Sequence, residues 1–191
     1  LSSKIVFLAR FLRPHSSFLI PHPCSGMKVL KFGGTSVGSP AAIRGLIDIL
    51  KGYHQRGDRF TVIFSAFSKV TDTLLEMAQK ASKGDKVYLD LLENVRSRHL
   101  DAIAALLEPD HRAPVEAHIL SNFEALGNVL QGIFLLREAS ARSLDFVVSF
   151  GERNSAAIIA HAMNGNGIPT EFLDTRELVR TDAHFGSAKV D

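Results

Sequence analysis

The sequence predicts an α/β fold, and three observations support this prediction. Residues 28–32 and 60–64 are short apolar runs with the length and composition of buried strands. Each run is followed by a loop and then by apolar residues at helical spacing. A third strand candidate, residues 170–173, follows a long helical stretch. Strands that alternate with helices in this way form a mainly parallel sheet whose faces are covered by helices.

The expected helices have clear sequence signals. Ser39 is the predicted N-cap of the first helix, and Pro40 is its first residue. The apolar residues of that helix recur at i, i+3, i+4 and i+7, namely Ile43, Leu46, Ile47 and Leu50. A second helix is expected from Val70, and a last one over residues 145–163. Between them, two long helices separated at residues 108–110 predict a helical hairpin inserted in the α/β unit. The second of these has its apolar face at Val115, Ile119, Phe123, Leu126, Leu130 and Ile133.

Composition and charge exclude several classes of protein. The chain has 191 residues, 46% apolar and 22% charged, which is the balance of a soluble globular protein. The net charge is +2, of which residues 1–26 contribute +3 and the rest −1. A nearly neutral body offers no electrostatic footprint for nucleic acid. No apolar run reaches the roughly 18–20 residues that span a bilayer, so no membrane partner is expected either.

Residues 1–26 are expected to be disordered and to lie outside the fold. They contain no acid and are interrupted by Pro14, Pro21 and Pro23. We interpret them as a non-native extension ahead of a start at Met27, and the alternative is an organellar transit peptide. The only cysteine, Cys24, cannot form an internal disulfide, which fits a reducing compartment. A cytoplasmic location is therefore predicted, and an organellar one only if these residues are a transit peptide.

The strongest candidate site is the run Lys31-Phe32-Gly33-Gly34-Thr35-Ser36-Val37. In an open α/β sheet, ligands bind outside the carboxyl ends of the strands. Here a lysine lies near a strand end, two glycines expose backbone N–H groups, and a helix N-terminus that favours anions follows. The pattern is neither a Walker A loop nor a G-x-G-x-x-G loop. The plain alternative is an ordinary strand-to-helix turn with a solvated lysine.

This run closely resembles the opening motif of the aspartate kinases, which belong to the amino-acid kinase family. Two further stretches resemble the next motifs of that family in the same order, Ser65-Ala66-Phe67-Ser68-Lys69-Val70-Thr71-Asp72 and Val148-Ser149-Phe150-Gly151-Glu152-Arg153. The resemblance covers residues 27–191, which we take as the N-terminal part of a catalytic domain. The helical insertion makes the chain most similar to the bifunctional aspartate kinase–homoserine dehydrogenases.

The resemblance implies a three-layer amino-acid-kinase sandwich that is incomplete at the C-terminus, because no Gly-Arg-Gly-Gly-Ser-Asp type motif is found. It also implies ATP-dependent phosphorylation of the aspartate side chain, the first step towards lysine, threonine and methionine, with Mg²⁺ and no protein metal ligand assigned. The fragment alone is expected to have little or no activity, and the full-length protein to be a homo-oligomer. The implied ATP-binding residues are Lys31, which is also catalytic, Phe32, Gly33 and Gly34, and the implied aspartate-binding residues are Thr35, Ser36, Ser65, Thr71 and Glu152.

Several of these roles have simpler alternatives. Ser65, Ser68 or Thr71 could cap the helix that begins near Val70, and Glu152 could be a solvated helix residue. Arg153 is better explained as a surface or ion-pairing residue than as a ligand, and the eight histidines as surface residues. For the whole protein, the alternatives are another amino-acid kinase, acting on glutamate, acetylglutamate or a nucleotide, or a non-catalytic module that binds a small anion.

Overall fold

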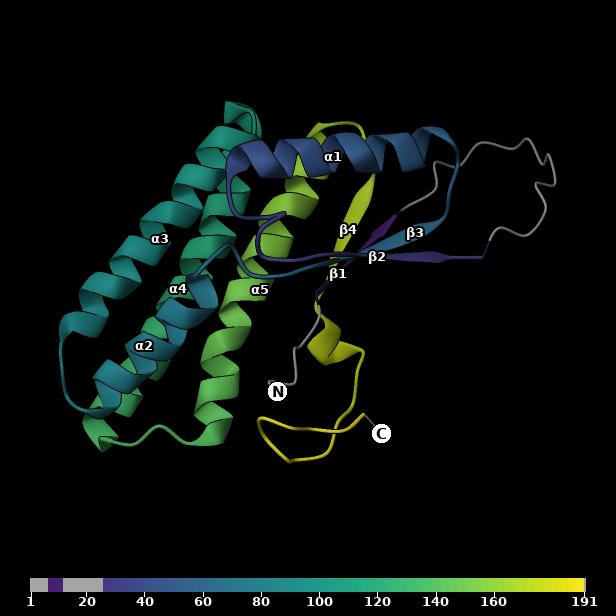
Figure 1. The fold of residues 1–191 in the computed structure, drawn as a ribbon. Coiled ribbons are helices and arrows are strands. Elements are labelled where there is room, and N and C mark those ends of the chain that lie inside the picture. Colours follow the sequence, from purple (N-terminus) through teal and green to yellow (C-terminus); the bar gives the residue numbers. More distant parts are fainter. Residues whose placement is uncertain (1–6, 12–25, 191) are drawn as a thin grey trace.

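The computed structural model describes the backbone of residues 7–11 and 26–190, and the side chains of residues 26–190. Strands and helices follow one another along this part of the chain as expected for an α/β protein (Figure 1). The elements are β1 (Phe7–Phe11), β2 (Lys28–Phe32), α1 (Pro40–Gln55), β3 (Phe60–Phe64), α2 (Val70–Ser82), α3 (Val87–Leu106), α4 (Pro109–Leu136), α5 (Ala141–Gly165), β4 (Thr170–Leu173) and the 3-10 turn η1 (Thr175–Glu177).

The sheet has four strands in the order β2-β3-β1-β4. β2 and β3 are parallel, with Lys28 opposite Phe60 and Phe32 opposite Phe64. The connection between them is α1, the helical crossover that a parallel pair requires. β1 is antiparallel to both β3 and β4, so β2, β3 and β4 all point in the same direction. The predicted α/β class with parallel strands is therefore confirmed, and β1 is the one strand of opposite direction.

β1 is a correction to the expectation that residues 1–26 lie outside the fold. Residues 7–11 form a strand between β3 and β4, where their backbone groups pair with a neighbour on each side. The prolines at positions 14, 21 and 23 exclude a long element, but they leave a five-residue run free to pair. Residues 1–6, 12–25 and 191 lie outside the described residues, so the rest of this expectation stays a prediction.

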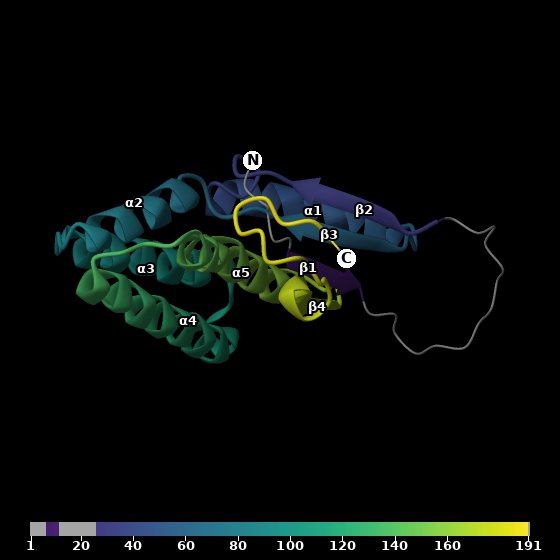
Figure 2. The ribbon, with the colours of Figure 1, turned by 90° about the horizontal axis from the view of Figure 1, so that it is seen from below.

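α1 packs on one face of the sheet and buries the four residues predicted for its apolar face. The predicted N-cap is confirmed, since Ser39 Oγ accepts a hydrogen bond from the Ala42 N–H at 3.2 Å. The view from below looks onto the other face of β2 and β3, over which no helix of the described part passes (Figure 2). Val29, 62% exposed, and Lys31 lie on that open face, because residues alternate along a strand.

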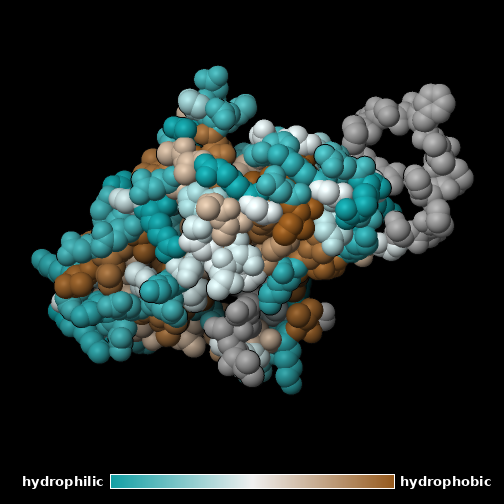
Figure 3. Space-filling view, turned by 45° about the horizontal axis from the view of Figure 1, so that its top comes forward, coloured by the Kyte–Doolittle hydropathy of each residue, from teal (hydrophilic) through white to brown (hydrophobic). Residues whose placement is uncertain are grey.

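The predicted helical hairpin is confirmed as α3 and α4, which pack with α2 and α5 into a bundle beside the sheet (Figure 1). All six apolar residues predicted for α4 are buried. By length and composition alone α4 could span a membrane, and a third of its most apolar window is buried. In this structure its buried face belongs to the bundle core, and hydrophilic residues cover much of the bundle surface in Figure 3.

His99 corrects the expectation that the histidines lie on the surface. The ring is fully buried between Phe67 and Phe123, at centroid distances of 4.9 and 5.2 Å. Its Nδ1 donates to the Val95 carbonyl oxygen at 2.7 Å, and its Nε2 has no hydrogen-bond partner within the described residues. Burial lowers the pKa of His99 to about 4, opposed by the bond to Val95 and aided by the charge of Arg98. His99 is therefore neutral in the folded protein at neutral pH.

This buried imidazole predicts a loss of stability on mild acidification. Between pH 6.5 and 4 the unfolded chain takes up a proton at His99 that the folded chain does not, so the free energy of unfolding falls as pH falls. We expect His99 to account for a loss of about 2 kcal/mol between pH 7.5 and pH 5. Urea denaturation of wild type and His99→Phe at both pH values measures this contribution as a difference between the two proteins. Equal pH dependence in wild type and variant would contradict the prediction.

Candidate active site

A cavity of about 480 Å³ opens where β2 and β3 end and the middle of α5 passes. Residues from three separate segments of the sequence line it, and these segments contain the three motifs singled out above. The lining consists of Gly34, Thr35, Ser65, Ala66, Phe67, Ser68, Lys69, Thr71, Asp72, Asp145, Val148, Ser149 and Glu152.

The parallel register of β2 and β3 brings the first two motifs together. Phe32 lies opposite Phe64, and the Ser65 N–H donates to the Phe32 carbonyl oxygen at 3.1 Å. Both loops therefore leave the sheet at the same edge. The loop after β2 folds into a turn, because the Ser36 N–H donates to the Gly33 carbonyl oxygen at 3.0 Å. This turn places Gly34 and Thr35 in the cavity wall.

The loop after β3 shows that its hydroxyl groups are not helix caps. The N-cap of α2 is Lys69, and no side chain makes a capping hydrogen bond there. The capping alternative for Ser65, Ser68 and Thr71 is therefore wrong for this structure. Lys69 has φ of 65°, a left-handed conformation that is uncommon for a residue with a side chain. The resulting sharp turn directs the chain from the loop into α2, and Ser65 and Thr71 both line the cavity.

α5 provides an acidic wall. Asp145, Ser149 and Glu152 are spaced i, i+4 and i+7, so they share one face of the helix. Glu152 is half-buried. Asp145 Oδ2 accepts a hydrogen bond from the Gly186 N–H at 2.7 Å, which ties the C-terminal segment to this helix. Asp145 and Ser149 were not among the predicted site residues, although the same helical spacing from Glu152 would have identified them.

The structure brings together five of the nine predicted site residues. Gly34, Thr35, Ser65, Thr71 and Glu152 line the cavity. The other four, Lys31, Phe32, Gly33 and Ser36, do not belong to its lining. Phe32 instead packs against Phe64 at 6.2 Å between ring centroids. Lys31 is exposed on the open face of the sheet, opposite Ile63, and forms no ion pair with any side chain of residues 26–190.

Arg153 follows Glu152 but does not line the cavity, and its side chain contacts Asp174 and Asn122 instead. Its Nε lies 3.8 Å from Asp174 Oδ2, and its guanidinium donates to Asn122 Oδ1 at 3.1 Å. Burial and the nearby Arg176 lower the pKa of Arg153, while Asp174 opposes this. The interpretation of Arg153 as an ion-pairing residue is confirmed, and the expectation that it is not a ligand stays a prediction.

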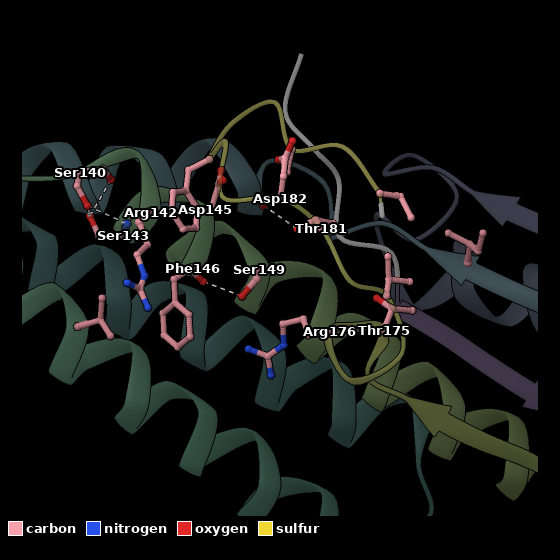
Figure 4. A pocket seen from close by; sticks show the side chains of 16 residues that line it. Ser140, Arg142, Ser143, Asp145, Phe146, Ser149, Thr175, Arg176, Thr181 and Asp182 are labelled. Atoms are coloured by element: carbon pink, nitrogen blue, oxygen red, sulfur yellow. Dashed lines mark hydrogen bonds between the residues drawn. The ribbon is translucent and has the colours of Figure 1, made fainter.

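A larger cavity of about 940 Å³ adjoins the first and is mostly apolar (Figure 4). The close-up shows the start of α5 on one side and the segment around Thr181 and Asp182 on the other. Asp145 and Ser149 line both cavities, so the N-terminal half of α5 is their common wall. Ile63, the neighbour of Lys31, lines the larger cavity.

The family model described as "Amino acid kinase family" matches residues 26–190. The chain belongs to the amino acid kinase family. The chain is 34% identical over 151 residues to a bifunctional aspartokinase/homoserine dehydrogenase 2, chloroplastic, of Zea mays, a match that covers 79% of this chain and 16% of that protein. It is 28% identical over 154 residues to aspartokinase 1, chloroplastic, of Arabidopsis thaliana, covering 78% of this chain and 26% of that one.

A solved structure supports the assignment of the fold. The crystal structure of E. coli aspartokinase III in complex with aspartate and ADP aligns with a TM-score of 0.75 and 25% identity, covering 87% of this chain and 35% of that one. The expected resemblance to aspartate kinases, and to the bifunctional ones in particular, is confirmed. The chain spans only about a sixth of the length of the bifunctional relatives it matches.

Proposed function

We propose that this chain forms part of the catalytic domain of an aspartate kinase, which transfers the γ-phosphoryl group of ATP to the side-chain carboxylate of aspartate. The observation that carries the proposal is that one cavity at the carboxyl ends of two parallel strands is lined by groups from all three motifs. Ligands of open α/β sheets bind at this edge. The product would be β-aspartyl phosphate, a mixed anhydride.

The polar groups of the cavity suit an amino acid as the acceptor. Glu152 would pair with the α-ammonium group, because a half-buried carboxylate is stabilised by a cationic partner. The hydroxyl groups of Ser65 and Thr71 would donate to the carboxylates of the substrate. Thr35 and Ser36, in the turn that follows β2, would lie between the substrate and the phosphoryl group. The aspartokinases among the relatives, and the aspartate in the E. coli structure, support this choice of acceptor.

The double glycine of the first loop suits a phosphate. Neither Gly33 nor Gly34 has a positive φ, so the backbone conformation does not require glycine at either position. A Cβ at Gly33 would meet nothing within 4 Å, and one at Gly34 would make only an ordinary contact with the Ala66 carbonyl oxygen. Packing among the described residues therefore does not explain this pair of glycines. A phosphate that approaches the backbone N–H groups closely would explain it.

The reaction requires positioning and charge stabilisation rather than a base. An aspartate side chain with its ordinary pKa near 3.9 is already ionised at neutral pH. One of its oxygens would attack the γ-phosphorus while the bond to the bridging oxygen of ADP breaks. Lys31 would stabilise the charge on the phosphoryl group in transfer, and Phe32, Gly33 and Gly34 would hold the phosphates.

Magnesium would accompany ATP, as it does in phosphoryl transfer generally. Within residues 26–190, no three His, Cys, Asp or Glu side chains are grouped so that they could hold a metal ion. Because Mg²⁺ commonly binds through substrate phosphates and water, we assign it no protein ligand here.

The remaining features of the whole protein are proposals as well. The resemblance implies that the adenine pocket comes from the second half of the kinase domain, so we expect little or no turnover from residues 1–191 alone. We also expect a homo-oligomer and no nucleic-acid or membrane partner. A cytoplasmic location stays the prediction, although the plant relatives are described as chloroplastic.

A coupled assay of ADP release by the protein with its complete kinase domain tests the function. Aspartate, glutamate, N-acetylglutamate and a nucleoside monophosphate are compared as acceptors, and hydroxylamine traps any acyl phosphate formed. We expect turnover with aspartate, and a preference for another acceptor would refute the proposal. Glu152→Gln is expected to raise KM for aspartate by roughly 10- to 100-fold and to leave KM for ATP unchanged, because a hydrogen bond to a charged group contributes about 1.5–3 kcal/mol.

A further inference from the structure

Arg98 of α3, a helix that contributes no residue to the cavity lining, makes hydrogen bonds to both loops of the candidate active site. Its Nη1 donates to the Ser68 carbonyl oxygen at 2.6 Å, and its Nη2 donates to the Gly38 carbonyl oxygen at 3.1 Å. The two carbonyls belong to the two loops that line the cavity, one after β2 and one after β3. Arg98 is half-buried and does not itself line the cavity.

The two carbonyls occupy equivalent places in their loops. Gly38 lies two residues before the start of α1, and Ser68 lies two residues before the start of α2. The loops touch at this point, since a Cβ on Gly38 would lie 3.4 Å from Ser68 Cβ. Among the described residues, the other hydrogen bond that joins the loops is the one at the strand ends, from the Ser65 N–H to the Phe32 carbonyl oxygen. The two loops are therefore joined at both ends. The hydrogen bond between Ser65 and Phe32 joins them where they leave the sheet, and Arg98 joins them just before α1 and α2 begin.

A guanidinium is suited to this task. Its planar fork presents several N–H groups in fixed directions, so one side chain can bind two carbonyl oxygens at once. The next residue on the helix acts on the same loop, because the buried ring of His99 stacks on Phe67, which lines the cavity. α3 thus holds the loop after β3 by a hydrogen bond and by an aromatic contact.

We propose that Arg98 is a positioning residue, which sets the separation of Gly34 and Thr35 from Ser65 and Thr71 by bridging the Gly38 and Ser68 carbonyls. The inference rests on the proposed function for its kinetic consequence, but the bridge itself is independent of the reaction catalysed. Loss of the bridge frees the two loops to move apart. A displacement of about 1 Å in a substrate-binding group can lower a rate by roughly 100-fold.

The kinetic test uses the protein with its complete kinase domain and the variants Arg98→Ala and Arg98→Lys. We expect Arg98→Ala to raise KM for aspartate and to lower kcat/KM by roughly 100-fold, because the binding groups lose their spacing. Arg98→Lys should recover little, since an ammonium on a flexible stem does not reproduce the fork. Guanidinium at low millimolar concentration should partly restore Arg98→Ala. The control is Arg96→Ala, two residues away on α3, where the side chain is exposed and pairs with Glu93.

The outcomes separate positioning from simple loss of folded protein. A merely structural role would lower kcat with the fraction folded, leave KM unchanged and give no rescue by guanidinium, and that pattern would overturn the proposal. Amide hydrogen exchange tests the role of Arg98 without requiring catalytic activity. Amides of residues 33–38 and 65–70 should exchange faster in Arg98→Ala than in Arg96→Ala, and equal exchange would also overturn it. If wild type phosphorylates no acceptor, the proposed function fails while the exchange result still decides the role of Arg98.

Discussion

Replacing Lys31 with alanine is expected to lower kcat for aspartate phosphorylation by about 100- to 1000-fold. This is the range seen when one preorganised electrostatic contact to a transition state is removed. Lys31 is exposed on β2 and has no ion-pair partner among the side chains of residues 26–190, so its loss should leave the melting temperature nearly unchanged. Steady-state kinetics and thermal denaturation of the same preparation measure both quantities.

Lys28→Ala is the matched control for this prediction. Lys28 lies on the same strand, three residues earlier, and its Nζ pairs with Asp58 Oδ1 at 2.9 Å on the exposed surface. The control removes the same type of side chain at the start of β2, the end of the strand opposite to the loop of the first motif, so kcat should stay close to that of wild type. If Lys31→Ala also retained most of its turnover, that result would contradict the catalytic role proposed for Lys31. The double glycine would then be better explained as part of a non-catalytic module that binds a small anion.

A second large effect is expected on stability when Gly151 is replaced with valine. A Cβ at this position of α5 would lie 2.9 Å from Ala66 Cβ and 3.2 Å from Leu74 Cδ1. The helix can approach the loop after β3 and α2 so closely only because position 151 has no side chain. Overpacking in such a site destabilises by about 3 kcal/mol, which lowers the melting temperature of a domain of this size by roughly 6–12 °C.

The Gly151 substitution should also disturb the site, because Ala66 and Glu152 both line the cavity. Gly45→Ala is the control, since Gly45 also lies within a helix but a Cβ there would meet nothing within 4 Å. Removing that glycine should leave stability unchanged or raise it by up to about 1 kcal/mol. Equal melting temperatures for Gly151→Val and wild type would show that α5 does not approach the loop as closely as the structure indicates.

The local elements could be predicted from the sequence because their signals are local. The strand runs 28–32 and 60–64, the Ser39 cap and the apolar face of α4 are all confirmed. These signals depend on residues within a few positions of one another. The meeting of the loops after β2 and β3 was also predictable, since parallel neighbouring strands end at the same edge of a sheet.

β1 and His99 could not be predicted in the same way. The strand at residues 7–11 exists through its pairing with β3 and β4, which lie more than 50 and 150 residues away in the sequence. The burial of His99 depends on Phe67 and Phe123, which come from a loop and from another helix. In both cases the stabilising contacts are distant in sequence, and periodicity gives no sign of them.

The residues of Lys31–Val37 and of the two later motifs were enough by themselves to indicate the family, because all three stretches resemble motifs of the aspartate kinases and occur in the same order. Only the tertiary structure decided which of these residues share a cavity. It gathered Gly34, Thr35, Ser65, Thr71 and Glu152, left Lys31 on the open face of the sheet, and added Asp145 and Ser149. The physical reason is that strand register and the close approach of α5 at Gly151 set the distances between segments, and these depend on packing between residues far apart in the chain.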